Sequence, residues 1–380
     1  MTSTYFSSPA PESIVTRERA TLASYAMHSE TSRGRRYPES PHPYRGPFQR
    51  DRDRILHSSA FRRLAYKTQV FTGDLGDYHR NRLTHTLEVA TVARTLARAL
   101  RLNEDLVESL ALAHDLGHPP YGHAGEDALN ECLAEHGGFS HNRQGLRVLE
   151  LLEQRYPEFP GLNVSAEILD GHAARIDKHF DAGNLIEVQV VEAADSIAYD
   201  THDADDAMEL GLLTLDELLK IPLWRQAREQ LRESYRNLRG KTLRRALLHT
   251  LIDWQVGDLV AQAEQGIAAH GIRSAEDAKT APTIVRASSP LLERKRELEQ
   301  FLFDRVYRHP DVLRLREEAQ TSLHAMFAGY VQRPELMPER FRERMPSDGV
   351  ERTVCDYLAG MTDRYAEREY RRLFAGKASE

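Results

Sequence analysis

The sequence predicts an all-α protein, and three observations lead to this class. Apolar residues recur at helical spacing through most of the chain, turn residues separate these segments, and few stretches alternate apolar and polar residues as strands do. Of the 380 residues, 41% are hydrophobic and 29% are charged, which is typical of a globular protein. A chain of this length exceeds one ordinary core, so we expect a central helical body with additional helices.

The chain divides into four predicted regions. Residues 1–49 form an irregular N-terminal arm, rich in Pro and suited to wrapping a neighbouring chain. Residues 50–205 contain the clearest helical periodicity and form the predicted core, and residues 206–330 form an extension of charged amphipathic helices. Residues 331–380 start as an exposed connection and return to a C-terminal helix.

A histidine and an aspartate are adjacent in the core segment LALAHDLGHPPYGHAGE, at His114 and Asp115. Leu106, Leu110 and His114 follow one another at four-residue spacing, so His114 should lie on the buried stripe of a helix. Neighbouring residues on a helix diverge by about 100°, so this pair can share one ion most easily at a helix end. Gly117 and the prolines after it supply such an end.

Two further side chains of ligand type lie far from this pair in the sequence. His85 belongs to the amphipathic segment RLTHTLEVA, and Asp195 belongs to VEAADSIAYD. Imidazole and carboxylate groups are usual ligands of divalent ions in hydrolytic sites. A single buried histidine is more often a hydrogen-bonded core residue, and this alternative stays open for His85 or Asp195 alone. Together with His114 and Asp115, however, they predict a metal site.

The order His85, His114 with Asp115, and Asp195 resembles the H…HD…D signature of the HD-domain phosphohydrolases. The segments FQRDRDRILHSSAFRRLAYKTQVF, GGFSHNRQGLRVLE and DYLAGMTDRYA are similar to those of the deoxyguanosine triphosphate triphosphohydrolase-like branch. The resemblance covers most of the chain and implies an HD-domain helical core whose active site a C-terminal helix completes. It also implies hydrolysis of dGTP or other deoxynucleoside triphosphates, by water attack at the α phosphorus, to deoxynucleoside and inorganic triphosphate.

The resemblance implies one divalent metal ion per site. Because mixed nitrogen and oxygen ligands do not determine the metal, Mg²⁺ and Mn²⁺ are expected first, with Fe, Ni, Co and Zn as alternatives. Two other functions stay open: a nucleotide-sensing regulator without strong turnover, and an HD-type phosphohydrolase of nucleoside monophosphates or cyclic nucleotides.

His123 and Glu126 lie three residues apart in GHAGE. At the start of a helix both would face one way, so the carboxylate could orient the imidazole and stabilise its charge. The resemblance implies that these two residues are the catalytic pair. We expect His123 to act as a general acid toward the leaving oxygen, with a role as base or nucleophile left open. The alternative is a surface ion pair on a first helical turn.

Substrate-binding residues are also implied by the resemblance. The matched positions are His118 and His141 for the phosphates, Gln69, Tyr199 and Asp203 for the 3′ hydroxyl, and Val70 and Tyr357 for a wall that excludes a 2′ hydroxyl. Arg82 is a further predicted phosphate contact, because a polyanion requires cations and Arg82 lies one helical turn before His85. An arginine fork suits phosphate oxygens, and an unpartnered hydroxyl against apolar atoms is disfavoured by about 1 to 3 kcal/mol. Simpler alternatives are loop histidines, a core tyrosine at 357, and a solvated acidic run around Asp203.

Composition sets the remaining expectations. A net charge of −7 and a pI near 6.2 argue against general DNA binding, so single-stranded DNA is an unsupported partner. Two cysteines provide no disulfide framework, and neither a membrane-spanning stretch nor a signal peptide is recognisable, which predicts a cytoplasmic protein. Related enzymes are commonly oligomers, and some respond to a second deoxynucleotide. A homo-oligomer is therefore expected and an activating deoxynucleotide stays open, whereas base preference has no sequence motif.

Overall fold

The computed structural model describes residues 13–69, 80–176, 183–235 and 237–374 of the chain. Within these ranges the regular elements are helices, accompanied by three isolated β-bridges. The predicted all-α class is therefore confirmed. None of the described helices is both long enough and apolar enough to cross a membrane.

The helices of the first half of the chain carry the candidate site. They are α1 (Ile14–Thr21), α2 (Pro47–Leu56), α3 (Ser59–Arg63), α4 (Arg82–Ala99), α5 (Glu104–Ala113), α6 (Gly122–Cys132), α7 (His141–Arg147), α8 (Ala166–Ala174) and α9 (Ile186–Glu209). The second half contains α10 (Leu215–Leu218), α11 (Pro222–Ser234), α12 (Gly240–His270), α13 (Ala275–Thr280), α14 (Ser289–Leu302), α15 (Pro310–Gln332), α16 (Glu339–Arg342), α17 (Met345–Asp348), α18 (Val350–Ala359) and α19 (Asp363–Phe374).

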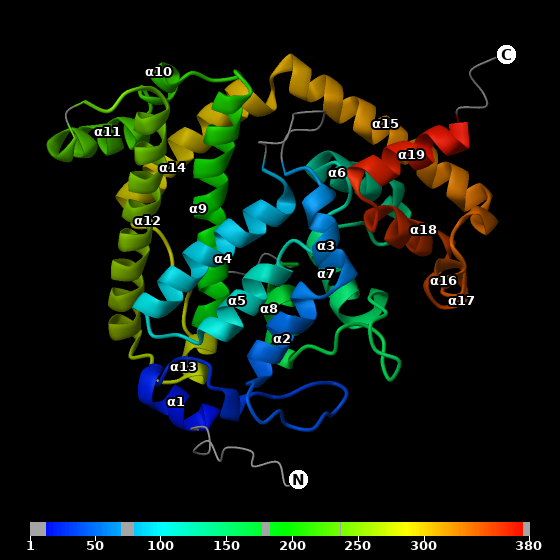
Figure 1. Cartoon of the computed structure of the whole chain (residues 1–380), viewed down its shortest axis with the longest axis horizontal. Coiled ribbons are helices and arrows are strands. Elements are labelled where there is room, and N and C mark those ends of the chain that lie inside the picture. The colour runs from blue at the N-terminus through cyan, green and yellow to red at the C-terminus, as the bar shows by residue number, and fades with distance from the viewer. Residues whose placement is uncertain (1–12, 70–79, 177–182, 236, 375–380) are drawn as a thin grey trace, which may run out of the picture.

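The largest core lies where α4, α5 and α9 pack against one another, with α2, α8 and α12 around them (Figure 1). Val89, Ala93 and Leu96 follow one stripe of α4 and are completely buried, as the helical period requires for a helix that faces the core. This packing brings residues near 85, 114 and 195 together although they are distant in the sequence.

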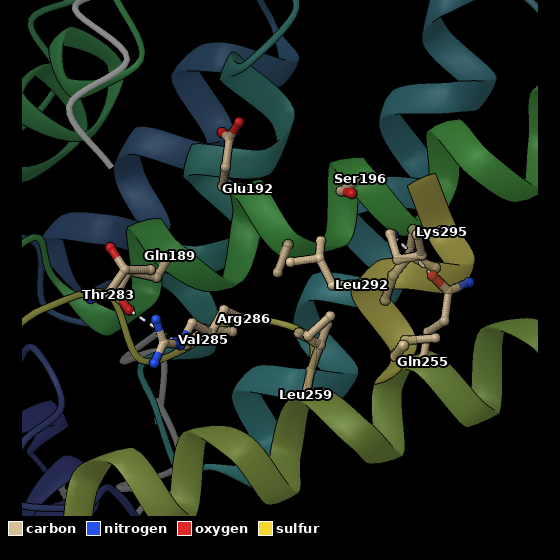
Figure 2. Close-up of a pocket in the computed structure, with 14 residues that line it drawn as sticks. Gln189, Glu192, Ser196, Gln255, Leu259, Thr283, Val285, Arg286, Leu292 and Lys295 are labelled. Carbon is tan, nitrogen blue, oxygen red and sulfur yellow. Dashed lines mark hydrogen bonds between the residues drawn. The ribbon is translucent and has the colours of Figure 1, made fainter. Parts of the chain in front are cut away.

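Two smaller cores flank the central one on opposite sides in Figure 1. The C-terminal half of α9 packs with α11, α12 and α14, whereas α6 packs with α15, α18 and α19. Between α9, α12 and α14 lies a mainly apolar pocket of about 190 Å³, to which Leu259, Val285 and Leu292 contribute (Figure 2).

Local capping explains where the helices of the site begin and end. The Asn81 side chain accepts a hydrogen bond from the Thr84 amide at 3.0 Å, and the Asn81 amide donates one to the Thr84 hydroxyl at 3.1 Å, which forms a capping box at the start of α4. Helix α5 ends at Ala113, so His114 and Asp115 lie in the following turn. The predicted helix end at the HD pair is confirmed.

The described part of the N-terminal arm, residues 13–49, is more ordered than the sequence predicts. It contains α1 and a 3₁₀ turn at Ser29–Thr31, and Met27 is buried in the central core. The Met27 amide donates a hydrogen bond of 2.8 Å to the Glu187 carboxylate on α9. Likewise, the predicted connection at residues 331–349 contains short helices, among them α16 and α17. The boundaries of the four regions, and an arm around a neighbouring chain, stay predictions.

Candidate active site

The four predicted ligand side chains converge on one point. His85 Nε2 lies 3.1 Å from Asp195 Oδ1, and His114 Nε2 lies 3.7 Å from the same oxygen. The Asp115 Oδ1 atom lies 3.4 Å from His114 Nε2. His85, His114 and Asp115 are almost completely buried. These residues come from α4, the turn after α5, and α9, so the helix packing of the central core positions them.

The hydrogen bond of His114 Nδ1 leaves the other ring nitrogen, Nε2, available to a metal ion. Its Nδ1 lies 2.6 Å from the carbonyl oxygen of Ala111, which can only accept, so Nδ1 carries the proton. Burial lowers the pKa of His114, which keeps the ring neutral. Its Nε2 atom is then a bare acceptor that is buried without a hydrogen-bond partner. An unpartnered buried nitrogen beside two carboxylates fits a divalent cation.

Two arginines contact the carboxylates of this group from outside. Arg82 Nη1 donates to Asp115 Oδ2 at 2.9 Å, and Arg175 Nη2 donates to Asp195 Oδ2 at 3.0 Å. Burial alone would raise the pKa of each carboxyl group. The guanidinium groups of Arg82 and Arg175 nevertheless help to hold the pKa values of Asp115 and Asp195, respectively, below their usual range. Both carboxylates are therefore ionised and available to a cation.

A second group of polar side chains lies beside the first. Glu126 accepts hydrogen bonds from His123 Nδ1 at 3.2 Å and from His141 Nδ1 at 2.9 Å. Burial would raise the pKa of Glu126, but the hydrogen bonds from these two histidines lower it. The His118 ring packs edge-on against His141 with centroids 3.8 Å apart. The predicted contact of His123 and Glu126 is present, and His141 shares the same carboxylate.

Gly117 joins the two groups through a close backbone approach. A Cβ atom at this position would lie 2.0 Å from the His141 carbonyl oxygen and 2.1 Å from the Gly145 amide nitrogen. No side chain fits in that space, so glycine lets α7 rest directly on the turn that carries His114 and Asp115. This contact holds His141 against Glu126 and next to the buried group.

A cavity of about 390 Å³ connects the two groups of side chains. It is lined by Gln69, Arg82, His85, Asp115, His118, His123, His141, Asn142, Arg175, Glu192 and Asp195. The predicted phosphate contacts Arg82, His118 and His141 thus face the same space as the predicted metal ligands. Arg82 is almost completely buried, and its second nitrogen Nη2 donates to the Gln69 carbonyl at 3.2 Å.

The C-terminal helices reach the site through two polar contacts. The buried Lys67 ammonium group donates to the carbonyl oxygens of His118 and Ala359. The Asp363 carboxylate accepts from the amide of Thr68 at 2.8 Å and from that of Tyr121 at 3.0 Å. These contacts anchor α18 and α19 to the segments on both sides of the cavity.

The residues predicted for the sugar fall into separate places. Gln69 lines the cavity, and its Oε1 atom is buried without a partner. Tyr199 and Asp203 lie on α9 beside Tyr307, whose hydroxyl donates to Asp203 and whose ring stacks on Tyr199 with centroids 6.2 Å apart. Tyr307 was not predicted from the sequence.

Among the residues that the structure describes, neither predicted wall residue lines this cavity. Val70 lies outside the described residues. Tyr357 is buried on α18, where its ring packs 4.9 Å from that of Phe341 and its hydroxyl lies 3.1 Å from that of Tyr365. Tyr357 lines a different cavity, of about 270 Å³, together with Arg63. The assignment of both residues to the wall stays a prediction.

Three lining residues were also missed from the sequence, namely Asn142, Arg175 and Glu192. Asn142 directly follows His141, so the histidine was the available signal for it. Arg175 and Glu192 have no motif of their own, and only the packing of α8 against α7 and of α9 against α4 brings them to the cavity.

Comparisons with known proteins agree with this geometry. Residues 82–200 match the family model of the HD domain, and residues 285–372 match that of the phosphohydrolase-associated domain. The chain is 45% identical over 369 residues to a deoxyguanosinetriphosphate triphosphohydrolase-like protein of Geobacter sulfurreducens, covering 94% of this chain and 96% of the relative. This chain is also similar to proteins with the same name from Ralstonia pickettii and Azoarcus sp., at 44% and 45% identity over 367 and 372 residues. These matches cover 93% and 94% of this chain, and 95% and 98% of the relatives.

Proposed function

The chain belongs to the deoxyguanosinetriphosphate triphosphohydrolase-like family of HD-domain hydrolases, and on this premise we propose that it hydrolyses deoxynucleoside triphosphates to deoxynucleoside and inorganic triphosphate. The main support is one juxtaposition. The buried, unpartnered Nε2 atom of His114 and the His123–Glu126 pair belong to groups that face a single cavity. One group is suited to hold a cation, and the other to transfer a proton.

In this proposal His85, His114, Asp115 and Asp195 hold one divalent ion. When bound, such an ion supplies Lewis-acid activation of water and of the phosphoryl group. The inner oxygens Asp115 Oδ1 and Asp195 Oδ1 face the histidine nitrogens, whereas the outer oxygens are engaged by Arg82 and Arg175. Mg²⁺ and Mn²⁺ are the first ions to test, since this ligand set does not select one metal.

His123 is the proposed general acid. Its Nδ1 atom faces Glu126, so Nε2 is the atom that would donate a proton to the 5′ oxygen as its bond to the α phosphorus breaks. The Glu126 carboxylate orients the imidazole through this hydrogen bond. The His123 side chain is 63% exposed, which gives it access to a ligand entering from solvent. His118 and His141 are proposed to contact phosphate oxygens.

Tyr199, Asp203 and Gln69 are proposed to bind the 3′ hydroxyl of the sugar. The Tyr307 ring beside Tyr199 and Asp203 offers an apolar surface near that position, and Tyr357 is the alternative from the family resemblance. Truncating the true wall should relax discrimination against ribonucleotides by about 1 to 3 kcal/mol. Comparing dGTP with GTP in Tyr307→Ala and Tyr357→Ala variants separates the two assignments.

The function is tested by product analysis in ¹⁸O-labelled water. Purified protein is incubated with each of the four deoxynucleotides, singly and mixed, with Mn²⁺ or Mg²⁺. We expect deoxynucleoside and triphosphate, with the label in the triphosphate because water attacks the α phosphorus. Release of only orthophosphate or pyrophosphate contradicts the proposal, as does hydrolysis restricted to monophosphates or cyclic nucleotides. Mixtures also test for an activating deoxynucleotide, and light scattering of the same samples tests for a homo-oligomer.

A further inference from the structure

The carboxylates at the proposed metal site share one arrangement. Asp115 Oδ2 accepts from Arg82 at 2.9 Å, while Asp115 Oδ1 lies 3.4 Å from His114 Nε2. Asp195 Oδ2 accepts from Arg175 at 3.0 Å, while Asp195 Oδ1 lies 3.1 Å from His85 Nε2. In both cases a guanidinium group occupies the outer oxygen and leaves the inner oxygen facing the histidines.

Arg175 is itself held by two other side chains. Its Nη1 atom donates to Glu192 Oε2 at 2.5 Å, and its Nε atom donates to Asn142 Oδ1 at 3.4 Å. The Asn142 amide also donates to the Arg175 carbonyl at 3.2 Å. With only 10% of its side chain exposed, Arg175 has a fixed position at the end of α8. A planar guanidinium bound on several sides is a rigid orienting group.

Glu192 and Asp195 lie one turn apart on α9, so a single guanidinium can bind both carboxylates. Figure 2 shows Glu192 on the same helix as Gln189 and Ser196, with its carboxylate directed away from Leu259 and Leu292 in the apolar pocket. The Glu192 carboxylate therefore binds Arg175 and does not point into the apolar pocket.

We propose that Arg175 is a positioning residue, which turns Asp195 Oδ1 toward the metal ion, and that Glu192 and Asn142 hold Arg175 in place. Resting on the metal site of the proposed function, this inference concerns a residue that does not itself touch the ion. Hydrogen-bonded partners of metal ligands typically change metal affinity by about 10-fold to 100-fold when they are removed.

Charge and orientation make opposite predictions for Arg175. Of the residues that the structure describes, three carboxylates and two guanidinium groups line the cavity, namely Asp115, Asp195 and Glu192 with Arg82 and Arg175. Removing the positive charge of Arg175 makes the cavity more negative, so electrostatics alone would strengthen cation binding. Loss of orientation would weaken it, because Asp195 would no longer be held in one rotamer. The sign of the change therefore distinguishes the two roles.

The experiment measures Mn²⁺ binding by calorimetry in the absence of nucleotide. In Arg175→Met we expect the dissociation constant for Mn²⁺ to rise by about 10-fold or more. Glu192→Gln should raise it less, since Asp195 keeps its partner. Arg175→Lys keeps the positive charge and changes only the orienting group. One ammonium group cannot hold two carboxylates in the geometry of a guanidinium. This variant should also bind Mn²⁺ more weakly than the parent.

Arg147→Met is the matched control. Arg147 binds Asp356 through two nitrogens, at 3.0 and 2.5 Å, but does not line the cavity. This variant loses a comparable ion pair and should keep the Mn²⁺ affinity of the parent. The visible spectrum of bound Co²⁺ provides a second readout. It should change in Arg175→Met and Arg175→Lys, and remain unchanged in Arg147→Met.

Unchanged or tighter Mn²⁺ binding in both Arg175 variants overturns the inference. So does a rise only in the KM for nucleotide at saturating Mn²⁺, which would make Arg175 a substrate-binding residue. If the parent binds no divalent ion, the proposed function and the inference both fail. If the parent binds the ion and the Arg175 variants bind it equally well, only the inference fails.

Discussion

Two groups of side chains meet at one cavity, and their histidines His114 and His123 differ in burial and in hydrogen bonding. His85 and His114 are buried, with His114 only 1% exposed, and their group is assembled from helices far apart in the sequence. The His123 side chain is 63% exposed, and its partner Glu126 lies one turn further along the same helix. His114 Nε2 is buried without a partner, whereas His123 is hydrogen-bonded to Glu126 and largely exposed.

This difference indicates a division of labour. A buried nitrogen with no partner is costly unless a cation occupies the site, so the first group is suited to binding. An exposed imidazole with a carboxylate on one nitrogen keeps its other nitrogen free to exchange a proton with a ligand. Metal occupancy and turnover, measured in the same variants, should therefore separate binding from proton transfer.

The largest effect is expected in the buried group. His114→Ala removes the bare Nε2 atom and should abolish both metal occupancy and turnover, because the remaining ligands no longer close around the ion. Metal content per chain, measured by mass spectrometry after dialysis, checks the first effect, and nucleotide hydrolysis checks the second. Full metal occupancy in this variant would assign the ion to another site.

The next largest effect is expected at His123. His123→Ala should lower kcat by about 10²-fold to 10⁴-fold while metal content stays at the level of the parent. His324→Ala is a suitable control, since His324 Nε2 pairs with Glu131 at 3.1 Å in another exposed contact. Its kcat should be unchanged. A loss of metal in His123→Ala would contradict the division between the two groups.

Metal binding should also increase the free energy of unfolding. At a Mn²⁺ concentration of 100 times Kd, the free energy of unfolding should increase by about 2.7 kcal/mol in the parent. His123→Ala should show the same increase and His114→Ala none. Thermal unfolding with and without chelator measures this, and equal stabilisation of all three proteins would mean that Mn²⁺ binds elsewhere.

The smallest effect is expected where the two groups meet. Gly117→Ala places a methyl group against the backbone of α7 and should lower the free energy of unfolding by about 1 to 3 kcal/mol. Gly257→Ala, in the middle of α12 with no atom within 4 Å of the new Cβ, should instead raise it by about 0.5 to 1 kcal/mol. Denaturant unfolding compares them. Equal stabilities would show that α7 moves away from the turn at no cost.

The sequence predicted the residues whose chemistry is unusual and missed those whose position is unusual. His114 beside Asp115 stands out because two adjacent polar side chains in a core-facing segment both need partners. The end of α5 agrees with the prediction. Arg175 is one arginine among many, and only the packing of α7, α8 and α9 gives it its partners. The same reasoning applies to Tyr307, which reaches Tyr199 and Asp203 from a distant part of the chain.

The N-terminal arm shows a different limit. Its prolines predict irregular backbone, but no local pattern reports that Met27 reaches Glu187 across the central core. A buried carboxylate accepts hydrogen bonds from whichever backbone amides the fold places beside it. Because these contacts depend on tertiary structure, no local sequence pattern predicts them.

The Lys67 ammonium group, which donates to the carbonyls of His118 and Ala359, bears on how this enzyme can be shortened. The stretch that matches the HD domain ends at residue 200, which invites its expression as an isolated catalytic fragment. A fragment of residues 1–200 would keep Lys67 and the His118 carbonyl, which lies close to the turn that bears the proposed metal ligands, but it would lose the Ala359 carbonyl. A stop codon before Ala359 should therefore damage the site as surely as a substitution within it.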